Sequence, residues 1–333
     1  MLDIKHISKT FNPGTITEKL ALHDVSLHLG AGDFVTVIGG NGAGKSTLMN
    51  SIAGTYPVDE GTIEIAGTDI TKWPEHKRAK FIGRVFQDPM MGTAAGMMIE
   101  ENLAIAARRG RRPTLHWSSS SKDREHFREL LAGLKLGLED RLESKVGLLS
   151  GGQRQALTLL MATMAKPKLL LLDEHTAALD PKTAEKVLGL TESIVREQQL
   201  ATLGLGLEAR MTSKVGLLSG GQRQALTLLM ATMAKPKLLL LDEHTAALDP
   251  KTAEKVLGLT ETIVREQQLT TLMITHNMRD ALRLGNRLIM MYNGHILFDV
   301  SGEEKAHLTV KDLLAMFEKA AGSELTSDSL LLS

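Results

Sequence analysis

The chain has 333 residues, 39 basic and 39 acidic side chains, and no cysteine. Hydrophobic residues at 43% and charged residues at 23% are ordinary for a globular protein and exclude a wholly disordered chain. The zero net charge argues against nucleic acid as a partner, and the lack of cysteine excludes disulfides, thiolate zinc sites and a cysteine nucleophile. Because no apolar run approaches the roughly 20 residues of a membrane span and the amino terminus has no apolar leader, we expect a cytoplasmic protein.

A phosphate-binding loop is predicted at residues 39–47. The apolar, β-branched run 33–38 predicts a buried parallel strand, and residues 48–53 favour a helix. Between them the sequence matches G-x-x-x-x-G-K-[ST] in its required context. Glycines let backbone N–H groups converge on phosphate, Lys45 supplies charge to the β- and γ-phosphates, and Ser46 can bind Mg²⁺. The predicted phosphate-binding residues are Gly39, Gly40, Asn41, Gly42, Ala43, Gly44, Lys45, Ser46 and Thr47.

A tandem repeat follows, in which residues 134–202 recur at 203–271 with six differences in 69 positions. Solenoids need about three or more units, so two long and nearly identical copies indicate a duplication or an error in sequence assembly. Removing one copy leaves 264 residues. Because the copies match, the chain could cross from one to the other anywhere in the repeat and still build a whole fold. We expect the surplus apolar strand and helix to have no partner within the chain, which favours swapping or aggregation.

Each copy contains a run of four leucines followed by two carboxylates, Asp173-Glu174 and Asp242-Glu243. The leucines predict a buried strand, and α/β sheets bind ligands at the carboxyl ends of their parallel strands. Adjacent strand residues point to opposite faces. The aspartate can therefore face Mg²⁺ while the glutamate reaches an attacking water molecule.

Other elements are predicted from local patterns. Ser120 and Asp123 have the spacing of a capping box at the start of a helix. Apolar residues predict strands at 272–275 and 288–292, the second turning through Asn293-Gly294 into a strand at 295–298. A helical spacing of apolar residues indicates a helix at about 308–320.

Residues 149–155, Leu-Ser-Gly-Gly-Gln-Arg-Gln, and their copy at 218–224 resemble the signature motif of ABC-type ATPases. In that family, the signature of one subunit contacts the γ-phosphate bound by a second subunit. The resemblance therefore implies a homodimer that encloses two ATP molecules. The implied contact residues are Ser219, Gly220, Gly221 and Gln222, or in the first copy Ser150, Gly151, Gly152 and Gln153.

The remaining family motifs occur in the family's order. Gln87 resembles the glutamine of the Q-loop, residues 178–180 and 247–249 resemble the D-loop, and His276 resembles the switch histidine. Phe11 lies where the family places an aromatic ring that stacks on adenine. The resemblance covers nearly the whole chain except the surplus copy.

The resemblance implies an α/β fold of the P-loop NTPase class, with the whole of 1–333 forming a single ABC ATPase domain. Its core would carry an antiparallel β subdomain, at about 1–30 and 60–70, and a helical subdomain at 90–145. Because inserts are best tolerated in peripheral loops, such as those of the helical subdomain, we favour the second copy as the working one. The first copy stays open as the alternative.

The implied activity is Mg²⁺-dependent ATP hydrolysis. Glu243, or Glu174 in the alternative copy, would polarise the attacking water, and His276 would contact the γ-phosphate. Mg²⁺ would be held by Ser46, by Asp242 or Asp173, and by Gln87, which would also sense the nucleotide and couple it to a membrane partner. These roles follow from the family resemblance together with the electrostatics of phosphoryl transfer.

Residues 83–93 and 173–184 resemble the ATPase subunits of bacterial importers, a group associated with amino acids such as tryptophan. The implied partners are an integral-membrane permease and a periplasmic or extracellular substrate-binding protein, with this chain peripheral on the inner face of the membrane. Two alternatives stay open. One is an ABC ATPase without a permease that works in DNA repair or translation, and the other is an inactive product of a duplicated or misassembled gene.

Overall fold

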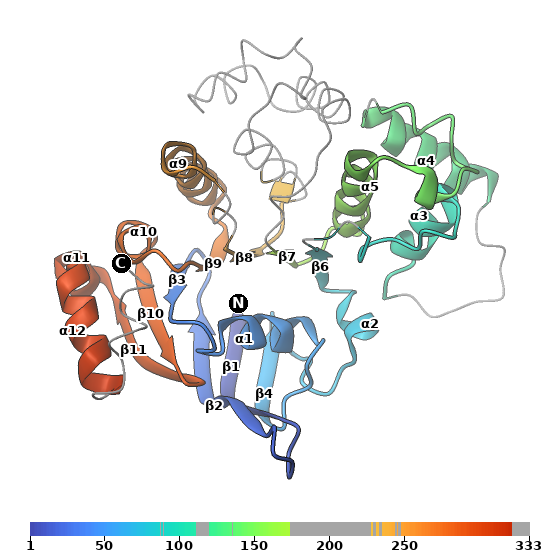
Figure 1. Cartoon of the computed structure of the whole chain (residues 1–333). Helices are drawn as coiled ribbons and strands as arrows, with labels where there is room; N and C mark the ends of the chain where they lie inside the picture. Colours follow the sequence, from blue (N-terminus) through green and yellow to red (C-terminus); the bar gives the residue numbers. More distant parts are fainter. Residues whose placement is uncertain are drawn as a thin grey trace. The chain divides into compact units, whose positions relative to one another are not determined.

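The computed structural model describes residues 1–86, 88, 90–110, 120–134, 136–173, 228, 231–232, 235–243, 245 and 248–321 (Figure 1). The chain forms two compact units. Unit 1 comprises Met1–Ile82, Lys237–Glu243 and Val264–Ser333, and unit 2 comprises Gly83–Pro236 and His244–Ile263. No helix among the described residues combines the length and the apolar character that a bilayer crossing requires.

Unit 1 contains an antiparallel sheet of four strands in the order β2-β1-β4-β5. The strands are β1 (Leu2–Phe11), β2 (Lys19–Leu29), β4 (Glu60–Ile65) and β5 (Thr68–Asp69). Leu2 and Ile4 are buried, whereas Asp3 is half-buried and Lys5 is exposed, so the start of β1 turns one face to the core. An antiparallel sheet is therefore present where the family resemblance implies one.

Unit 1 also holds five strands of a larger sheet of seven, in the order β11-β10-β3-β9-β8. The strands are β3 (Phe34–Ile38), β8 (Leu238–Asp242), β9 (Thr270–Ile274), β10 (Arg287–Tyr292) and β11 (His295–Ser301). The pairs of β10 with β3, β3 with β9, and β9 with β8 are parallel, and β11 is antiparallel to β10. All five residues of β3 are buried, as expected for a central parallel strand.

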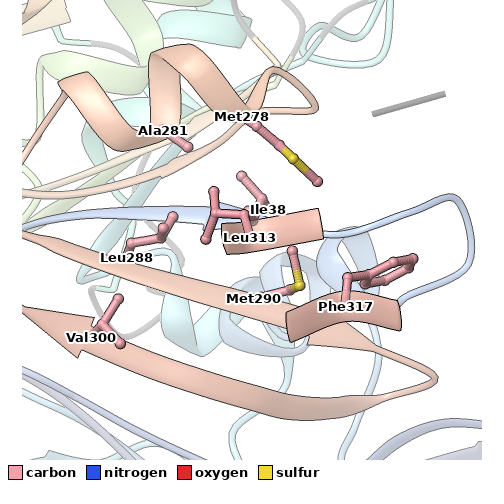
Figure 2. Packing of buried hydrophobic residues seen from close by; sticks show 8 residues of the cluster. All are labelled: Ile38, Met278, Ala281, Leu288, Met290, Val300, Leu313 and Phe317. Carbon is pink, nitrogen blue, oxygen red and sulfur yellow. The ribbon is translucent and has the colours of Figure 1, made fainter. Parts of the chain in front are cut away.

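Helices cover the edge of this sheet that holds β10 and β11. The helices are α10 (Met278–Arg283), α11 (Gly302–His307) and α12 (Val310–Ala321). Figure 2 shows the apolar cluster that α10 and α12 form with the strands, made up of Ile38, Met278, Ala281, Leu288, Met290, Val300, Leu313 and Phe317. Leu313 and Phe317 lie four residues apart on one face of α12, which confirms the helix that the apolar spacing predicts.

Two helices link the sheets of unit 1 in sequence, α1 (Lys45–Ala53) and α2 (Glu75–Arg78). The guanidinium of Arg78 is buried and donates hydrogen bonds to the carbonyl oxygens of Ser51 (2.6 Å) and Ile52 (2.9 Å) in the last turn of α1. These carbonyl groups have no partner within the helix itself. Arg78 therefore anchors the end of α1 that lies opposite Lys45.

Unit 2 contains the first copy of the leucine strand and most of the remaining helices. Its elements are β6 (Ile82–Val85), α3 (Ile99–Ala107), α4 (Ser121–Gly133), the 3₁₀ turn η1 (Val146–Leu148), α5 (Gly151–Thr163) and β7 (Leu169–Asp173). The capping box predicted for α4 is present, since Asp123 N donates to Ser120 Oγ at 3.2 Å and Ser120 N donates to Asp123 Oδ2 at 2.9 Å. Helix α9 (Pro250–Gln267) bridges the sequence boundary between the units.

Both leucine strands are incorporated into sheet structure. Strand β8 of the second copy pairs in parallel with β9, from Leu238 opposite Thr270 to Asp242 opposite Ile274. Strand β7 of the first copy is hydrogen-bonded to β6. The prediction that a surplus strand would lack a partner in the chain is therefore wrong. The accompanying helix expected in the first copy, at 183–198, lies outside the described residues, whereas the corresponding residues of the second copy are part of α9.

Candidate functional site

The loop between β3 and α1 is shaped by glycines at two points where no side chain fits. A Cβ atom on Gly39 would lie 2.3 Å from the carbonyl oxygen of Met291, and one on Gly44 would lie 2.6 Å from that of Ala21. Gly44 also has a φ of 100°, which favours glycine. Because Gly44 caps α1 without a side-chain hydrogen bond, the first turn keeps its N–H groups available to an anion.

Lys45 opens α1 and is buried, with 8% of its surface exposed. Its ammonium group donates hydrogen bonds to the carbonyl oxygens of Gly39 (2.6 Å) and Gly40 (3.1 Å). Burial lowers the pKa of Lys45, while the carboxylates of Glu243 and Asp242 oppose that shift. The loop thus holds a desolvated cation whose counter-charges come from the end of β8.

A pocket of about 350 Å³ opens over this loop within unit 1. It is lined by Phe11, Lys19, Ala21, Asn41, Gly42, Ala43, Gly44, Lys45, Ser46, Thr47 and Glu243. Most of the predicted phosphate-binding residues therefore face one cavity, together with one carboxylate of the second repeat copy. The sequence reasoning missed Lys19 and Ala21, which come from β2 and carry no motif.

The positions of the two carboxylates of the second copy are set by where β8 ends. Asp242 is the last residue of that strand and is buried, with 9% of its surface exposed. Glu243 leaves the strand with a φ of 40°, and its backbone N–H donates to the carbonyl oxygen of Ile274 at 3.2 Å. This left-handed residue ends the ladder and directs the chain out of the sheet at the point where Glu243 lines the pocket.

Glu243 and His276 form an ion pair in which Oε2 of the glutamate lies 3.8 Å from Nδ1 of the histidine. Glu243 raises the pKa of His276 above its ordinary value, and His276 lowers the pKa of Glu243. His276 follows β9, where Thr275 N donates to Val37 O at 3.1 Å, and about half of its side chain is exposed. The structure therefore brings the predicted glutamate and histidine into contact.

Phe11 ends β1 and lines the same pocket as the phosphate loop. Its ring meets that of Tyr56 edge to face, with centroids 5.1 Å apart, and the Lys9 ammonium lies 5.8 Å from its centroid. Tyr56 was not predicted from the sequence because 45 positions separate it from Phe11 and it belongs to no motif. The pocket thus has an aromatic wall in addition to its phosphate loop.

The first signature motif lies in unit 2 at the start of α5. Ser150 Oγ accepts from Gln153 N at 3.3 Å, and Gln153 Oε1 accepts from Ser150 N at 3.2 Å. Arg154 is buried and donates to the carbonyl oxygens of Val146 and Gly147 at 3.1 and 3.2 Å. Serine and the two glycines thus form the capped amino terminus of a helix, a geometry that suits an anion.

Asp173, the aspartate of the first copy, has a different environment. It ends β7 in unit 2, and its Oδ2 lies 2.9 Å from Nη2 of Arg84 on β6. Side-chain exposures of 27% for Asp173 and 14% for Arg84 make this a half-buried pair. The carboxylate is therefore already matched by a cation of its own unit.

Several predicted site residues lie outside the described part of the chain. They are Gln87, Glu174, Ser219, Gly220, Gly221 and Gln222. Their predicted roles stay predictions.

Comparison with known proteins identifies the family. The family model described as ABC transporter matches residues 22–177 and 181–246. A tyrosine transport ATP-binding protein of Clostridioides difficile (strain R20291) is 37% identical over 325 residues, covering 96% of this chain and 100% of that protein. The methionine import ATP-binding protein MetN of Escherichia coli (strain K12) is 33% identical over 231 residues, covering 67% of this chain and 64% of that protein.

Solved structures agree on the fold. The dimeric structure of a bacterial ABC transporter cassette aligns with a TM-score of 0.51 and 22% identity, covering 90% of this chain and 98% of that chain. A nucleotide-free ATP-binding cassette from an ABC transporter aligns with a TM-score of 0.50 and 23% identity, covering 95% of each chain. These confirm the predicted P-loop cassette fold. The chain belongs to the ABC transporter family and is one of its ATPases.

Proposed function

We propose that this ABC ATPase hydrolyses ATP at the pocket over Lys45 and thereby powers the uptake of an amino acid. The observation that carries the proposal is the meeting, in one pocket of unit 1, of the phosphate loop and Glu243, with His276 paired to that glutamate. A buried lysine beside two carboxylates and a histidine supplies the charges that phosphoryl transfer needs.

The residues each have a distinct task in the proposed mechanism. Lys45 and the N–H groups of the first turn of α1 neutralise the phosphate oxygens as charge moves to the leaving group. Glu243, whose pKa is lowered, is ionised and accepts a hydrogen bond from the attacking water. His276 holds that carboxylate in position and donates to the γ-phosphate. Phe11 offers its ring face to the adenine.

The oxygen donors near the loop fit Mg²⁺. Ser46 is exposed at the start of α1, and Asp242 ends β8 beside Lys45. Mg²⁺ is usually held by one or two protein oxygens together with substrate phosphates, so this sparse donor set suits it. When bound there, the ion would neutralise charge on the β- and γ-phosphates. The Ser46 hydroxyl and the Asp242 carboxylate would hold it.

The proposal draws on both repeat copies. Asp242 and Glu243 of the second copy supply the carboxylates. The second copy is also the one that the position of the repeat in the sequence favours. For the signature, the capped helix start at Ser150 supports the first copy. In the family's arrangement, the Ser150 hydroxyl and the following glycine amides would reach the γ-phosphate held by a second copy of the chain.

The relatives support an importer. One relative is named for tyrosine transport and others are named for methionine import. An amino acid is therefore the proposed class of solute. The expected partners are an integral-membrane permease, a substrate-binding protein outside the membrane and a second copy of this chain. Docking on the permease would make the protein peripheral on the inner face of the membrane.

The repeat provides a matched control for the test of catalysis. Glu243→Gln and Glu174→Gln make the same change in two copies whose local sequences are identical. We expect Glu243→Gln to reduce ATP turnover by at least about a hundredfold while ATP binding is retained, and Glu174→Gln to have little effect. Loss of turnover only in Glu174→Gln would refute the assignment. Turnover that persists in Lys45→Ala would refute the site itself.

Co-purification separates transport from the alternatives. We expect the chain, expressed with its neighbouring genes, to co-purify with a membrane protein that stimulates its ATPase activity. A chain that turns over ATP and associates with no membrane protein would favour the ATPase of DNA repair or translation. A chain that neither dimerises nor hydrolyses Mg-ATP would favour the inactive product.

A further inference from the structure

Two histidines from distant parts of unit 1 meet beside the phosphate loop. Nδ1 of His23 lies 3.2 Å from Nδ1 and 3.1 Å from Nε2 of His295, and the ring centroids are 4.4 Å apart. His23 lies on β2 and His295 opens β11, 272 positions later. Both side chains are exposed, so the ring nitrogens are open to solutes.

The backbone holds the two histidines in place. His23 N donates to the carbonyl oxygen of Gly294 at 2.9 Å, which ties β2 to the turn before β11. That turn carries Asn293 and Gly294 at φ values of 44° and 80°, the left-handed pair expected of a tight hairpin. Because the backbone is fixed at both histidines, only side-chain rotation is needed for the two rings to bind a common ligand. The χ2 torsion of histidine has a broad energy minimum, so this rotation has a low cost.

Two other histidines of the antiparallel sheet that carries His23 are engaged differently. His6 Nδ1 lies 2.7 Å from a carboxylate oxygen of Asp24, and His28 Nδ1 lies 3.6 Å from one of Asp3. At His23 and His295 the neighbouring acceptor is a second imidazole instead. Two imidazoles this close can bind one metal ion together.

The spacing and the donor type select a class of ligand. Two imidazole nitrogens bound to one tetrahedral ion at about 2.0–2.1 Å lie roughly 3.3 Å apart. Imidazole nitrogen suits Zn²⁺, Ni²⁺ and Cu²⁺, whereas Mg²⁺ and Ca²⁺ select oxygen. We propose that His23 and His295 form a binding site for a divalent transition-metal ion, completed by water and separate from the magnesium that accompanies ATP.

The location connects this site to the nucleotide pocket. Gly294 N donates to the carbonyl oxygen of Ala43 at 3.1 Å, and a Cβ on Gly44 would lie 3.4 Å from Gly294 Cα. An ion that joins His23 to His295 would cross-link the two segments that pack against the back of the phosphate loop. We expect such an ion to make the hairpin turn more rigid, independently of any nucleotide.

The test is metal binding to the full chain, free of any tag and nucleotide. Zn²⁺ is titrated by calorimetry into the parent chain and into His23→Ala, His295→Ala and the control His307→Ala, an exposed histidine on α11. We expect the parent and the control to bind one Zn²⁺ ion that neither pair variant binds with comparable affinity. The dissociation constant for this ion should be at least about tenfold higher in each pair variant. Zn²⁺ should also slow hydrogen exchange at the Gly294 amide in the parent and in the control, but in neither pair variant.

Equal Zn²⁺ binding by the parent and by both pair variants would overturn the proposal. In that case the rings only hydrogen-bond to each other. His23→Gln keeps a polar side chain and serves if His23→Ala fails to fold, which far-ultraviolet circular dichroism reports. Because no nucleotide is present, a negative result here would not count against the proposed ATPase site. Likewise, a negative result in the ATPase tests would not count against the metal site.

Discussion

Replacing Arg78 with methionine is expected to destabilise unit 1 and to disturb its phosphate loop. The guanidinium is 1% exposed. It donates to four carbonyl oxygens, those of Ser51 (2.6 Å), Ile52 (2.9 Å), Thr71 (2.8 Å) and Trp73 (2.8 Å). Methionine keeps the apolar stem but supplies no donor. The variant therefore leaves two buried and two partly buried acceptors without that partner.

The size of the effect follows from these bonds. A hydrogen bond to a charged group contributes about 1.5–3 kcal/mol, but bonds that share one side chain do not add, and burying the cation has a cost of its own. Burial lowers the pKa of Arg78, in keeping with that cost. We therefore expect a loss of about 3–5 kcal/mol in the free energy of unfolding, because a buried acceptor left without a partner costs about 1–3 kcal/mol and the four costs do not simply add. For a unit of this size, that lowers Tm by roughly 6–20 °C.

Thermal unfolding by calorimetry checks the stability, with Arg279→Met as a control because Arg279 is exposed on α10. Arg78→Lys should fall between the parent and Arg78→Met, since an ammonium group has at most three donors. Because Arg78 caps the far end of the helix that begins with Lys45, ATP affinity should fall as well. A Tm for Arg78→Met within about 2 °C of the parent would refute the reasoning.

Three further changes test separate parts of the structure. Gly44→Ala should weaken nucleotide binding, measured by fluorescence titration, by at least about tenfold, because its φ of 100° and a carbonyl oxygen 2.6 Å away exclude a methyl group. The pair of His276, with its raised pKa, and Glu243, with its lowered pKa, should stabilise the fold between those two values. That contribution is lost as pH rises through the raised histidine pKa or falls through the lowered glutamate pKa, and thermal melts of His276→Ala should lack the loss on the alkaline side. Arg84→Met and Asp173→Asn, singly and combined, should show a coupling of about 0.5–3 kcal/mol in urea unfolding, and simple additivity would contradict the ion pair.

The phosphate loop was predictable because its information is local. A strand, a glycine-rich turn and a helix follow each other within 21 residues, from 33 to 53, and the spacing alone positions Lys45. The wall of the pocket was not predictable in the same way. Lys19 comes from a strand of another sheet, and Tyr56 reaches Phe11 across 45 positions without any periodic signal. Such contacts depend on the tertiary fold rather than on a motif.

The choice between the repeat copies shows a second limit of sequence reasoning. Identical sequences have identical propensities, so only their surroundings can distinguish Asp173 from Asp242. Strand β8 is followed in sequence by α9 and β9, and it pairs with β9, which places Asp242 and Glu243 within reach of Lys45 in unit 1. Strand β7 pairs with β6, where Arg84 meets Asp173.

The pairing of both strands also explains how the chain can accommodate the repeat. An unpaired strand of four leucines would expose a row of backbone N–H and C=O groups and favour association with other chains. Here β8 pairs with β9 and β7 is hydrogen-bonded to β6, and the first carboxylate has its own cation. Extending a loop by tens of residues costs only about 2–3 kcal/mol in chain entropy, within a typical stability of about 5–15 kcal/mol. The repeat therefore adds a second carboxylate strand whose aspartate is held by Arg84, while the strand that pairs with β9 carries the carboxylates near the phosphate loop.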